Sequence, residues 1–308
     1  MTVPVPGPHG GDGPAVAAVL GVDPASMLDL SVSLNPCAPD VRNLALGHLD
    51  ALTQYPDAAR ATHALADAIG VDADRVVLTN GGAEAIALVA AELGPGWVAA
   101  PDFSLYRRHL PALVPGAPVW RSNPRNPTGE LARADARAAV WDEAFYPLAT
   151  GTWTRGDAGA VVLGSLTKVF GCPGLRVGYA LAPDPGLAHR VRARQPRWAV
   201  NGIAAALVPE MLARADLPAW ATEIGRLRAE LIAVLRAHGL RPRPSDAPYV
   251  LVDGAAGLRE RLAPLGVVVR DCTSFGLGGC ARVAVPDAGG LERLDAVLHA
   301  VAAQKVSA

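Results

Sequence analysis

The sequence predicts an α/β protein with a large domain, whose mainly parallel sheet is flanked by helices, and a small α+β domain at the C-terminal end. Two observations favour this fold. Short apolar runs alternate with helical stretches from residue 75 to about residue 200, as strands and helices do around a parallel sheet. Beyond residue 240 the apolar runs follow one another more closely, with one helical stretch between the first two and another at the end.

Five short apolar runs are predicted to be strands of the large domain, and a helix is predicted to open near Gly82, directly after the first of them. Their alternation with helical stretches is what indicates a mainly parallel sheet. The five runs are 75–80, 97–100, 139–144, 160–165 and 177–182.

A long amphipathic helix is predicted to connect the two domains. Its apolar residues recur at spacings of three and four, and Gly239 is placed to end it. Strands at 249–253, 267–272 and 281–286, with helices at 258–265 and from Gly290, would complete the small domain. The predicted division is an N-terminal arm at 1–36, a large domain at 37–215 and a small domain at 216–308. The apolar residues of the connecting helix are Trp220, Ile224, Leu227, Leu231, Val234 and Leu235.

Composition and charge exclude several classes of protein. The 28 basic and 29 acidic residues are mixed along the chain, without the basic block that would grip nucleic acid. The four cysteines lack C-x-x-C spacing and no histidine cluster accompanies them, so we expect reduced thiols and no metal site. No apolar run is long enough to cross a bilayer and the N-terminus lacks signal-peptide features, so we expect a soluble, cytoplasmic protein without membrane partners.

The segment from Ser165 to Tyr179 carries the strongest chemical signal. It follows a predicted buried strand and combines a hydroxyl, a lysine and an arginine with two glycines. A lysine shielded from water can lose its proton and attack an aldehyde, which suits Lys168 to forming an imine with an aldehyde cofactor. Ser165 and Arg176 can supply a hydroxyl and a guanidinium to a phosphate beside it. Taken alone, Lys168 and Arg176 would be surface cations near a turn.

Further polar segments precede this one. Residues 80–84, Asn-Gly-Gly-Ala-Glu, follow a strand and open a helix, so backbone N–H groups near Gly82 and Ala83 can receive a phosphate. Asp142 ends a predicted strand, Asn126 lies in an Asn-Pro turn, and Phe103 taken alone would be a core residue.

Together these segments resemble the fold-type I pyridoxal-phosphate (PLP) enzymes of the aspartate aminotransferase superfamily, in which S-x-x-K is followed by arginine eight residues after the lysine. The resemblance implies an aspartate aminotransferase-like fold and a PLP enzyme with catalytic Lys168 and Asp142. Lys168 would carry the cofactor and Asp142 would pair with its pyridine nitrogen, keeping the ring an electron acceptor. The other implied cofactor contacts are Gly82, Ala83, Phe103, Asn126, Ser165 and Arg176.

Peripheral motifs resemble the histidinol-phosphate aminotransferase group, and within it the threonine-phosphate decarboxylases of cobalamin biosynthesis. They are His9-Gly-Gly, the stretch ending in Asn35-Pro36, Tyr55-Pro-Asp, Trp198-Ala-Val-Asn, Arg270-Asp-Cys and Arg282.

These motifs imply a small substrate that carries both a carboxylate and a phosphate. Arg282 would take the carboxylate, His9 and Arg270 the distal phosphate, and Asn35 would also contact the substrate. The arm would pack against the small domain and the active site. Tyr55 would reach the cofactor phosphate of the neighbouring subunit, which implies a homodimer with a shared active site.

The chain also departs from the family. The stretches from Phe103 to Asn126 and from Gly129 to Asp142 are short, Phe145 stands where many relatives have tyrosine, and Gly164 replaces a common arginine. Three functions remain open. The first is decarboxylation of threonine phosphate, the alternative is an aminotransferase that uses histidinol phosphate or a related amino acid, and the third is a non-catalytic PLP-binding module.

Overall fold

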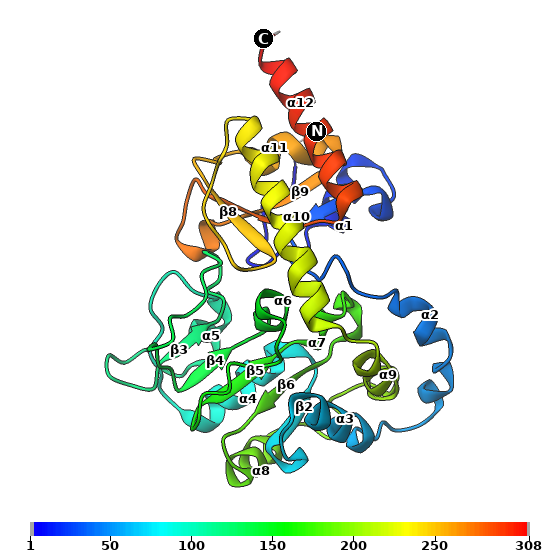
Figure 1. Ribbon diagram of the computed structural model, residues 1–308, viewed down its shortest axis with the longest axis vertical. Helices are drawn as coiled ribbons and strands as arrows, with labels where there is room; N and C mark the ends of the chain where they lie inside the picture. The colour runs from blue at the N-terminus through cyan, green and yellow to red at the C-terminus, as the bar shows by residue number, and fades with distance from the viewer. Residues whose placement is uncertain (1–2, 307–308) are drawn as a thin grey trace.

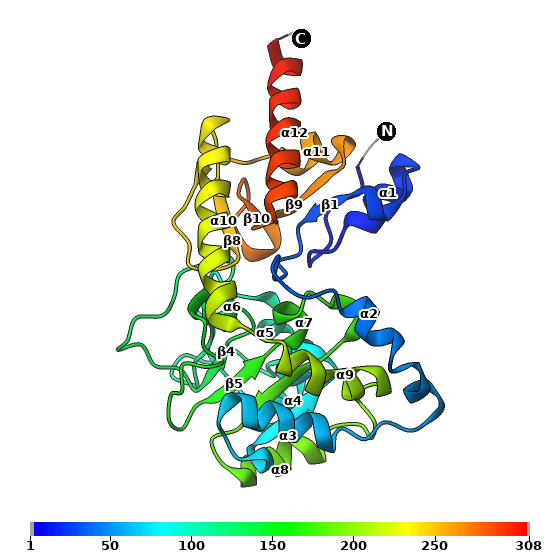
Figure 2. The same cartoon turned by 45° about the vertical axis from the view of Figure 1, so that its right-hand side comes forward.

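The computed structural model describes residues 3–306, which form two lobes joined by one long helix (Figures 1 and 2). Each lobe contains a five-stranded sheet. We propose the lobes as the large and small domains predicted from the sequence, with the boundary near residue 216. Residues 1–2 of the predicted arm and residues 307–308 of the predicted small domain lie outside the described part of the chain.

The sheet of the larger lobe has the strand order β2-β6-β5-β4-β3. The pairs β3/β4 and β4/β5 are parallel, whereas β6 is antiparallel to both of its neighbours. Four strands therefore point in one direction, which is the mainly parallel arrangement expected when helices connect the strands. The strands are β2 (Val76–Thr79), β3 (Trp120–Ser122), β4 (Val140–Asp142), β5 (Val161–Gly164) and β6 (Gly178–Leu181).

The prediction of a strand at residues 97–100 is wrong. Only isolated bridges form there, from Gly96 to Leu113 and from Trp97 to Val119. The segment that would pair with it, residues 111–118, contains three prolines, which have no backbone N–H to donate to a ladder. Pairing therefore stops after two bridges.

Helices cover both faces of this sheet. Val76 and Leu78 of β2 pack into the core on the side of α3 and α9, whereas Val77 packs into the core on the side of α4 and α8. This alternation buries the sheet on both faces, as in other α/β proteins. The helices are α2 (Val41–Leu46), α3 (Ala59–Ile69), α4 (Gly81–Leu93), α5 (Ser104–His109), α6 (Tyr146–Thr150), α7 (Leu166–Val169), α8 (Pro185–Ala193) and α9 (Gly202–Ala213).

The sheet of the smaller lobe includes a strand from the N-terminal segment. Its order is β1-β9-β10-β8-β7, with β1 parallel to β9 and the other pairs antiparallel. The N-terminal segment is therefore part of this lobe. The elements are α1 (Gly13–Leu20), β1 (Leu28–Leu30), β7 (Arg241–Pro242), β8 (Tyr249–Asp253), α11 (Leu258–Leu262), β9 (Val267–Asp271), β10 (Ala281–Ala284) and α12 (Ala288–Val306), and the short 3-10 helices of both lobes are Pro24–Ser26, Leu49–Thr53, Ala73–Arg75, Pro173–Leu175, Ala263–Leu265 and Thr273–Phe275.

The predicted connecting helix is α10 (Leu217–Ala237). Trp220 and Ile224, near its start, belong to the core of the larger lobe, and Leu227 and Leu231, further along, belong to the core of the smaller one. One apolar face thus packs into both cores, along a helix that runs from one lobe into the other (Figure 1). Although α10 has 21 residues, no helix in the described part of the chain is long and apolar enough to cross a membrane.

Candidate active site

A cavity of about 300 Å³ lies at the carboxyl ends of β4 and β5, beside the N-terminus of α4. The larger lobe, the smaller lobe and the N-terminal segment all contribute to its lining. The structure brings every predicted site residue to this cavity except Asn35 and Tyr55. Those that line it are His9, Gly82, Ala83, Phe103, Asn126, Asp142, Ser165, Lys168, Arg176, Arg270 and Arg282.

Lys168 lies on the short helix α7, which follows β5 directly. Its backbone is fixed because its N–H donates to Ser165 O at 3.1 Å. Burial lowers the pKa of Lys168 to about 8, and the positive charges of Arg282 and Arg176 act in the same direction. At pH 7 roughly one amine in ten is therefore unprotonated, far more than at the ordinary lysine pKa of 10.5, and the unprotonated form is the one that attacks an aldehyde.

Asp142, at the end of β4, supplies the one carboxylate among the described residues that line the cavity. The Tyr106 hydroxyl donates to its Oδ2 at 2.7 Å, and the Ala144 N–H donates to its Oδ1 at 3.0 Å. Burial raises the pKa of Asp142, whereas these two donors and the charge of Lys168 lower it. The carboxylate is therefore oriented by two donors and faces into a cationic cavity.

The N-terminus of α4 offers backbone N–H groups to the cavity beside Arg176. The first backbone N–H groups of a helix have no partner within the helix, and Asn80 provides no side-chain cap. A Cβ atom on Gly81 would lie 2.3 Å from Nη2 of Arg176, and one on Gly178 would lie 2.6 Å from the backbone nitrogen of Gly82. Glycine is thus required for the guanidinium and the helix end to come together.

Arg282 connects the two lobes at the base of the cavity. Its Nη1 donates to Asn126 Oδ1 at 2.7 Å, and its Nη2 donates to Ser31 O at 3.2 Å. The guanidinium lies over the ring of Tyr249, with its carbon 4.7 Å from the ring centroid. Its Nε is buried and makes no hydrogen bond within the described residues. The charge of a buried guanidinium that lines the cavity favours an anionic ligand there.

Arg270 holds the N-terminal segment over the cavity. Its Nη1 donates to Gly7 O at 2.8 Å, and its Nη2 donates to Pro8 O at 2.6 Å. These bonds place His9 at the cavity, where its ring lies 5.8 Å from that of Phe103. Burial and then Arg270 lower the pKa of His9, so the imidazole is neutral near pH 7.

Asn35, which is predicted to contact the substrate, is not among the residues that line the cavity. Its Nδ2 donates to Val169 O at 2.9 Å, and its Oδ1 accepts from the Cys37 N–H at 2.9 Å. Its backbone N–H also donates to Lys168 O at 3.1 Å. Both polar groups of the Asn35 side chain therefore make hydrogen bonds to backbone atoms, and the bond to Val169 O supports the helix that carries Lys168.

Tyr55 lies away from the cavity of its own chain. Its side chain is 78% exposed and stacks on Trp198, with ring centroids 4.3 Å apart. Trp198 is 54% exposed and has a φ of 59°, which is unusual for a residue other than glycine. The predicted contact of Tyr55 with a neighbouring subunit stays a prediction.

The sequence did not single out several residues that organise the site. Tyr106 was missed, although it lies three residues after Phe103, a spacing that shares a helix face. Ser122 was also missed: its Oγ donates to Asp102 at 2.5 Å and accepts from the Asn126 N–H at 2.8 Å. Burial raises the pKa of Asp102 to about 6. No local pattern marked the Ser122–Asp102 pair, because these two residues are 20 positions apart in the sequence.

Gly164 and Phe145, the two departures noted in the sequence, each have a structural reason. A Cβ atom on Gly164 would lie 2.0 Å from the ring of Tyr179, so no larger side chain fits there. Phe145 packs edge-on against Tyr249 at 5.2 Å. The ring of Tyr179 thus occupies the space beside Gly164, and the ring of Phe145 packs against that of Tyr249.

Comparisons with known proteins agree with this geometry. The sequence profile of the family "Aminotransferase class I and II" matches residues 117–301. The threonine-phosphate decarboxylase of Salmonella typhimurium is 29% identical over 95% of this chain and 96% of that protein. The histidinol-phosphate aminotransferase of Stutzerimonas stutzeri is 31% identical over 84% of this chain and 86% of that protein. The crystal structure of histidinol-phosphate aminotransferase from Sinorhizobium meliloti in complex with pyridoxal-5′-phosphate is similar with a TM-score of 0.81, at 19% identity, over 97% of this chain and 95% of that one.

The structural likeness confirms the predicted aspartate aminotransferase-like α/β fold. The alignment with the Salmonella protein extends over 352 positions, although this chain has 308 residues. That relative therefore has segments that this chain lacks, in agreement with the shortened connections noted in the sequence.

Proposed function

Since the chain belongs to the class I and II aminotransferase family, it is an enzyme with PLP as cofactor, and we propose that its substrate is a small amino acid carrying both a carboxylate and a phosphate. The finer proposal is decarboxylation of L-threonine O-3-phosphate for cobalamin synthesis, by a cytoplasmic homodimer. One observation carries the proposal: four cationic side chains line the cavity, namely Lys168, Arg176, Arg270 and Arg282. Among the described residues, only Asp142 adds a carboxylate to that lining. Such a cavity attracts a ligand with several negative charges.

The residues present fit PLP. The amides of Gly82 and Ala83 and the guanidinium of Arg176 would hold its phosphate, Asp142 would pair with its pyridine nitrogen, and Lys168 would bind its aldehyde carbon. When bound, the cofactor supplies an electron sink for a bond broken at the α-carbon of the substrate. The other proposed contacts are Phe103, Asn126 and Ser165.

The proposed substrate contacts lie on the opposite side of the cavity. Arg282 would take the carboxylate, because it is a buried cation that lines the cavity. His9 and Arg270 would take the phosphate. Because two Arg270 donors already bind Gly7 and Pro8, we propose that Arg270 acts partly by holding His9 in place.

The position of the carboxylate would decide which reaction follows. If Arg282 held the carboxylate so that the bond to it is the one broken, carbon dioxide would be lost, with the cofactor supplying the electron sink. The alternative is transamination, in which Lys168 removes the α-proton as a general base. The similarity to the Stutzerimonas aminotransferase supports this second candidate. The predicted non-catalytic module is not retained, because the family consists of enzymes.

Exposed apolar side chains support the proposed homodimer. Leu46 is 66% exposed and Leu52 is 69% exposed, and both lie in the same stretch of chain as Tyr55. Since Tyr55 does not reach its own cavity, a second copy of the chain is the partner that could use it there. Light scattering of the purified protein tests this: a dimer that becomes monomeric in Leu52→Asp supports the proposal, and a monomeric parent protein contradicts it.

The function is tested by mixing the purified protein with PLP and L-threonine O-3-phosphate, without any oxo acid. Release of carbon dioxide together with aminopropanol phosphate supports the decarboxylase. No release, combined with amino transfer from histidinol phosphate to 2-oxoglutarate, supports the aminotransferase instead. Inactivity on both substrates contradicts the proposed substrate class.

A further inference from the structure

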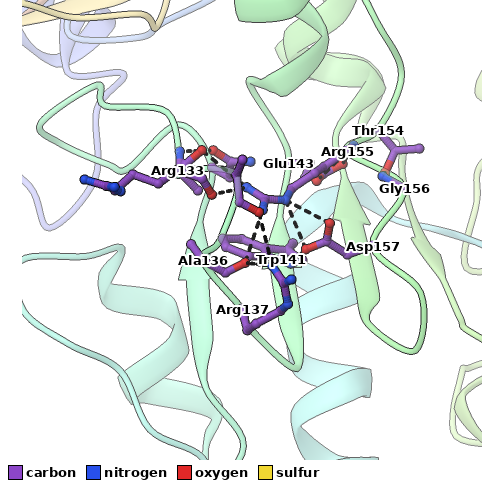
Figure 3. Close-up of polar contacts among 12 residues, drawn as sticks. Arg133, Ala136, Arg137, Trp141, Glu143, Thr154, Arg155, Gly156 and Asp157 are labelled. Carbon is purple, nitrogen blue, oxygen red and sulfur yellow. Dashed lines mark hydrogen bonds and ion pairs between the residues drawn. The ribbon is translucent and has the colours of Figure 1, made fainter.

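The connection between Gly129 and β4 has almost no regular structure of its own. Residues 130–139 contain one turn and neither helix nor strand. Figure 3 shows that they wrap around the side chain of Arg155, which comes from the loop between α6 and β5. The Arg155 side chain therefore holds in place a segment that has no helix or strand to fix its course.

Arg155 binds four backbone carbonyls of this segment. Its Nη1 donates to the carbonyl oxygens of Ala132 and Arg133, at 3.3 and 2.9 Å. Its Nη2 donates to those of Ala134 and Ala136, at 2.8 and 3.1 Å. A guanidinium has donors in a planar fork, which lysine cannot reproduce. The four bonds fix the course of the chain just before β4.

The same guanidinium is also bound to the residue that precedes Asp142. It lies over the ring of Trp141, 5.0 Å from the centroid, and its Nε donates to the carboxylate of Asp157 at 2.9 Å. Trp141 in turn donates from Nε1 to Asp157 at 2.9 Å. Arg155, Trp141 and Asp157 therefore each contact the other two, and Trp141 is fully buried (Figure 3).

The residue that follows Asp142 is bound to the same loop. The carboxylate of Glu143 accepts from the backbone N–H of Arg155, at 3.3 and 3.2 Å, and from the side chain of Thr154. Glu143 is fully buried. Residues 154–157 therefore hold both neighbours of Asp142.

The contacts of Arg155 lie on the side of Asp142 that faces away from the cavity. Successive side chains of a strand point to opposite faces, so Trp141 of β4 points away from the cavity into which Asp142 points, and Glu143, just after the strand, does not line that cavity either. We propose that Arg155 is a positioning residue for Asp142, acting through Trp141 and the segment 132–136. The inference rests on the cofactor-pairing role of Asp142 in the proposed function, and it adds a residue that touches neither cofactor nor substrate.

The test compares Arg155→Ala with the purified wild-type protein. The first readout needs no cofactor: it is hydrogen exchange of the Ala144 amide in the apoprotein, because this N–H donates to Asp142 Oδ1. The second is the dissociation constant of PLP. We expect both the exchange rate and the dissociation constant to rise on the order of tenfold, as when other supporting residues of a ligand are removed. Arg155→Lys should give an intermediate rise, since it keeps the charge and loses the fork.

Arg133→Ala is the matched control. It removes an arginine side chain from the same segment, but that side chain is exposed and, among the described residues, pairs only with the exposed Asp135, so both readouts should stay at their wild-type values. An Ala144 exchange rate and a PLP affinity that remain at wild-type values in Arg155→Ala would overturn the proposal, even if residues 132–136 exchange faster. If Arg155→Ala does not fold, Arg155→Lys decides by the same two readouts. Neither readout uses turnover, so a failure of the proposed decarboxylation would leave this result standing.

Discussion

The two walls of the cavity are built in different ways. The sheet wall, formed by Gly82, Asp142 and Lys168, consists of residues at the ends of strands and the start of a helix. The arm wall consists of His9, Arg270 and Arg282, and its shape depends on arginine side chains that bind backbone oxygens of the N-terminal segment.

This difference separates the part of the site that backbone geometry fixes from the part that side chains adjust. Substitutions in the sheet wall should affect cofactor binding and every reaction that depends on it. Substitutions in the arm wall should affect mainly which substrate is held and how.

The largest expected effect is that of Lys168→Ala, which removes the nucleophile from the sheet wall. Turnover should fall by at least about 10³-fold, because both the covalent attachment and the general base are lost. Carbon dioxide release and visible absorbance in saturating PLP are the measurements, with circular dichroism as the control for folding. Turnover near the wild-type rate would remove Lys168 from the mechanism.

Arg282→Ala tests the arm wall. Loss of the carboxylate anchor should lower kcat/KM for threonine phosphate on the order of 10²-fold. PLP affinity should change by only about threefold, because the cofactor contacts of the sheet wall remain. Steady-state kinetics and PLP titration separate the two effects. A PLP affinity that falls as much as kcat/KM would show that the two walls are not independent.

The pH dependence of the unfolding free energy tests Glu143, the buried neighbour of Asp142 in the sheet wall. Burial raises the pKa of Glu143 to about 7. Because the folded-state pKa exceeds the unfolded value near 4.5, its stabilising contribution is complete below about pH 4.5 and is lost as the pH rises through 7. The free energy of unfolding should therefore fall by ~3 kcal/mol over this window through Glu143.

Glu143→Gln provides the comparison for that experiment. The amide does not titrate, so the difference in unfolding free energy between the two proteins should depend on pH between 4.5 and 7 and be constant above it. Urea unfolding at several pH values measures it. A difference that is the same at every pH would mean that Glu143 does not titrate in this range.

The smallest expected effect is that of Arg259→Ala, which weakens the support of the arm outside the cavity. Arg259 donates to Pro4 O at 2.7 Å and to Asp12 Oδ2 at 3.1 Å. The free energy of unfolding should fall by about 2 kcal/mol, and limited proteolysis within residues 3–12 should become faster. The KM for threonine phosphate should rise while PLP affinity stays constant. Unchanged proteolysis and KM would show that Arg259 does not support the arm.

The sheet wall was the easier part to predict from the sequence. Lys168, Ser165 and Arg176 lie within twelve residues and follow an apolar strand, so their chemistry and their position appear together. The arm wall was predicted only through the family resemblance, and the spacing of Asn35 did not tell that its side chain lies behind Lys168.

Contacts between distant segments account for what the sequence could not reveal. Tyr106 reaches Asp142 across 36 positions, and Arg155 acts on carbonyl groups, which have no sequence signature. The false strand at 97–100 has a related cause. Its apolar residues resemble a strand, but pairing depended on the proline-rich segment that would be its neighbour.

The contact between Gly164 and Tyr179 has a consequence for sequence change in this chain. Because the tyrosine ring occupies the space that a side chain at 164 would need, the two positions cannot vary independently. Introducing arginine at 164 alone should prevent normal packing, whereas the same change combined with a small residue at 179 should be tolerated. Positions 164 and 179 should therefore covary among related chains, and a mutational path between the two pairs would pass through a less stable intermediate unless residue 179 changes first.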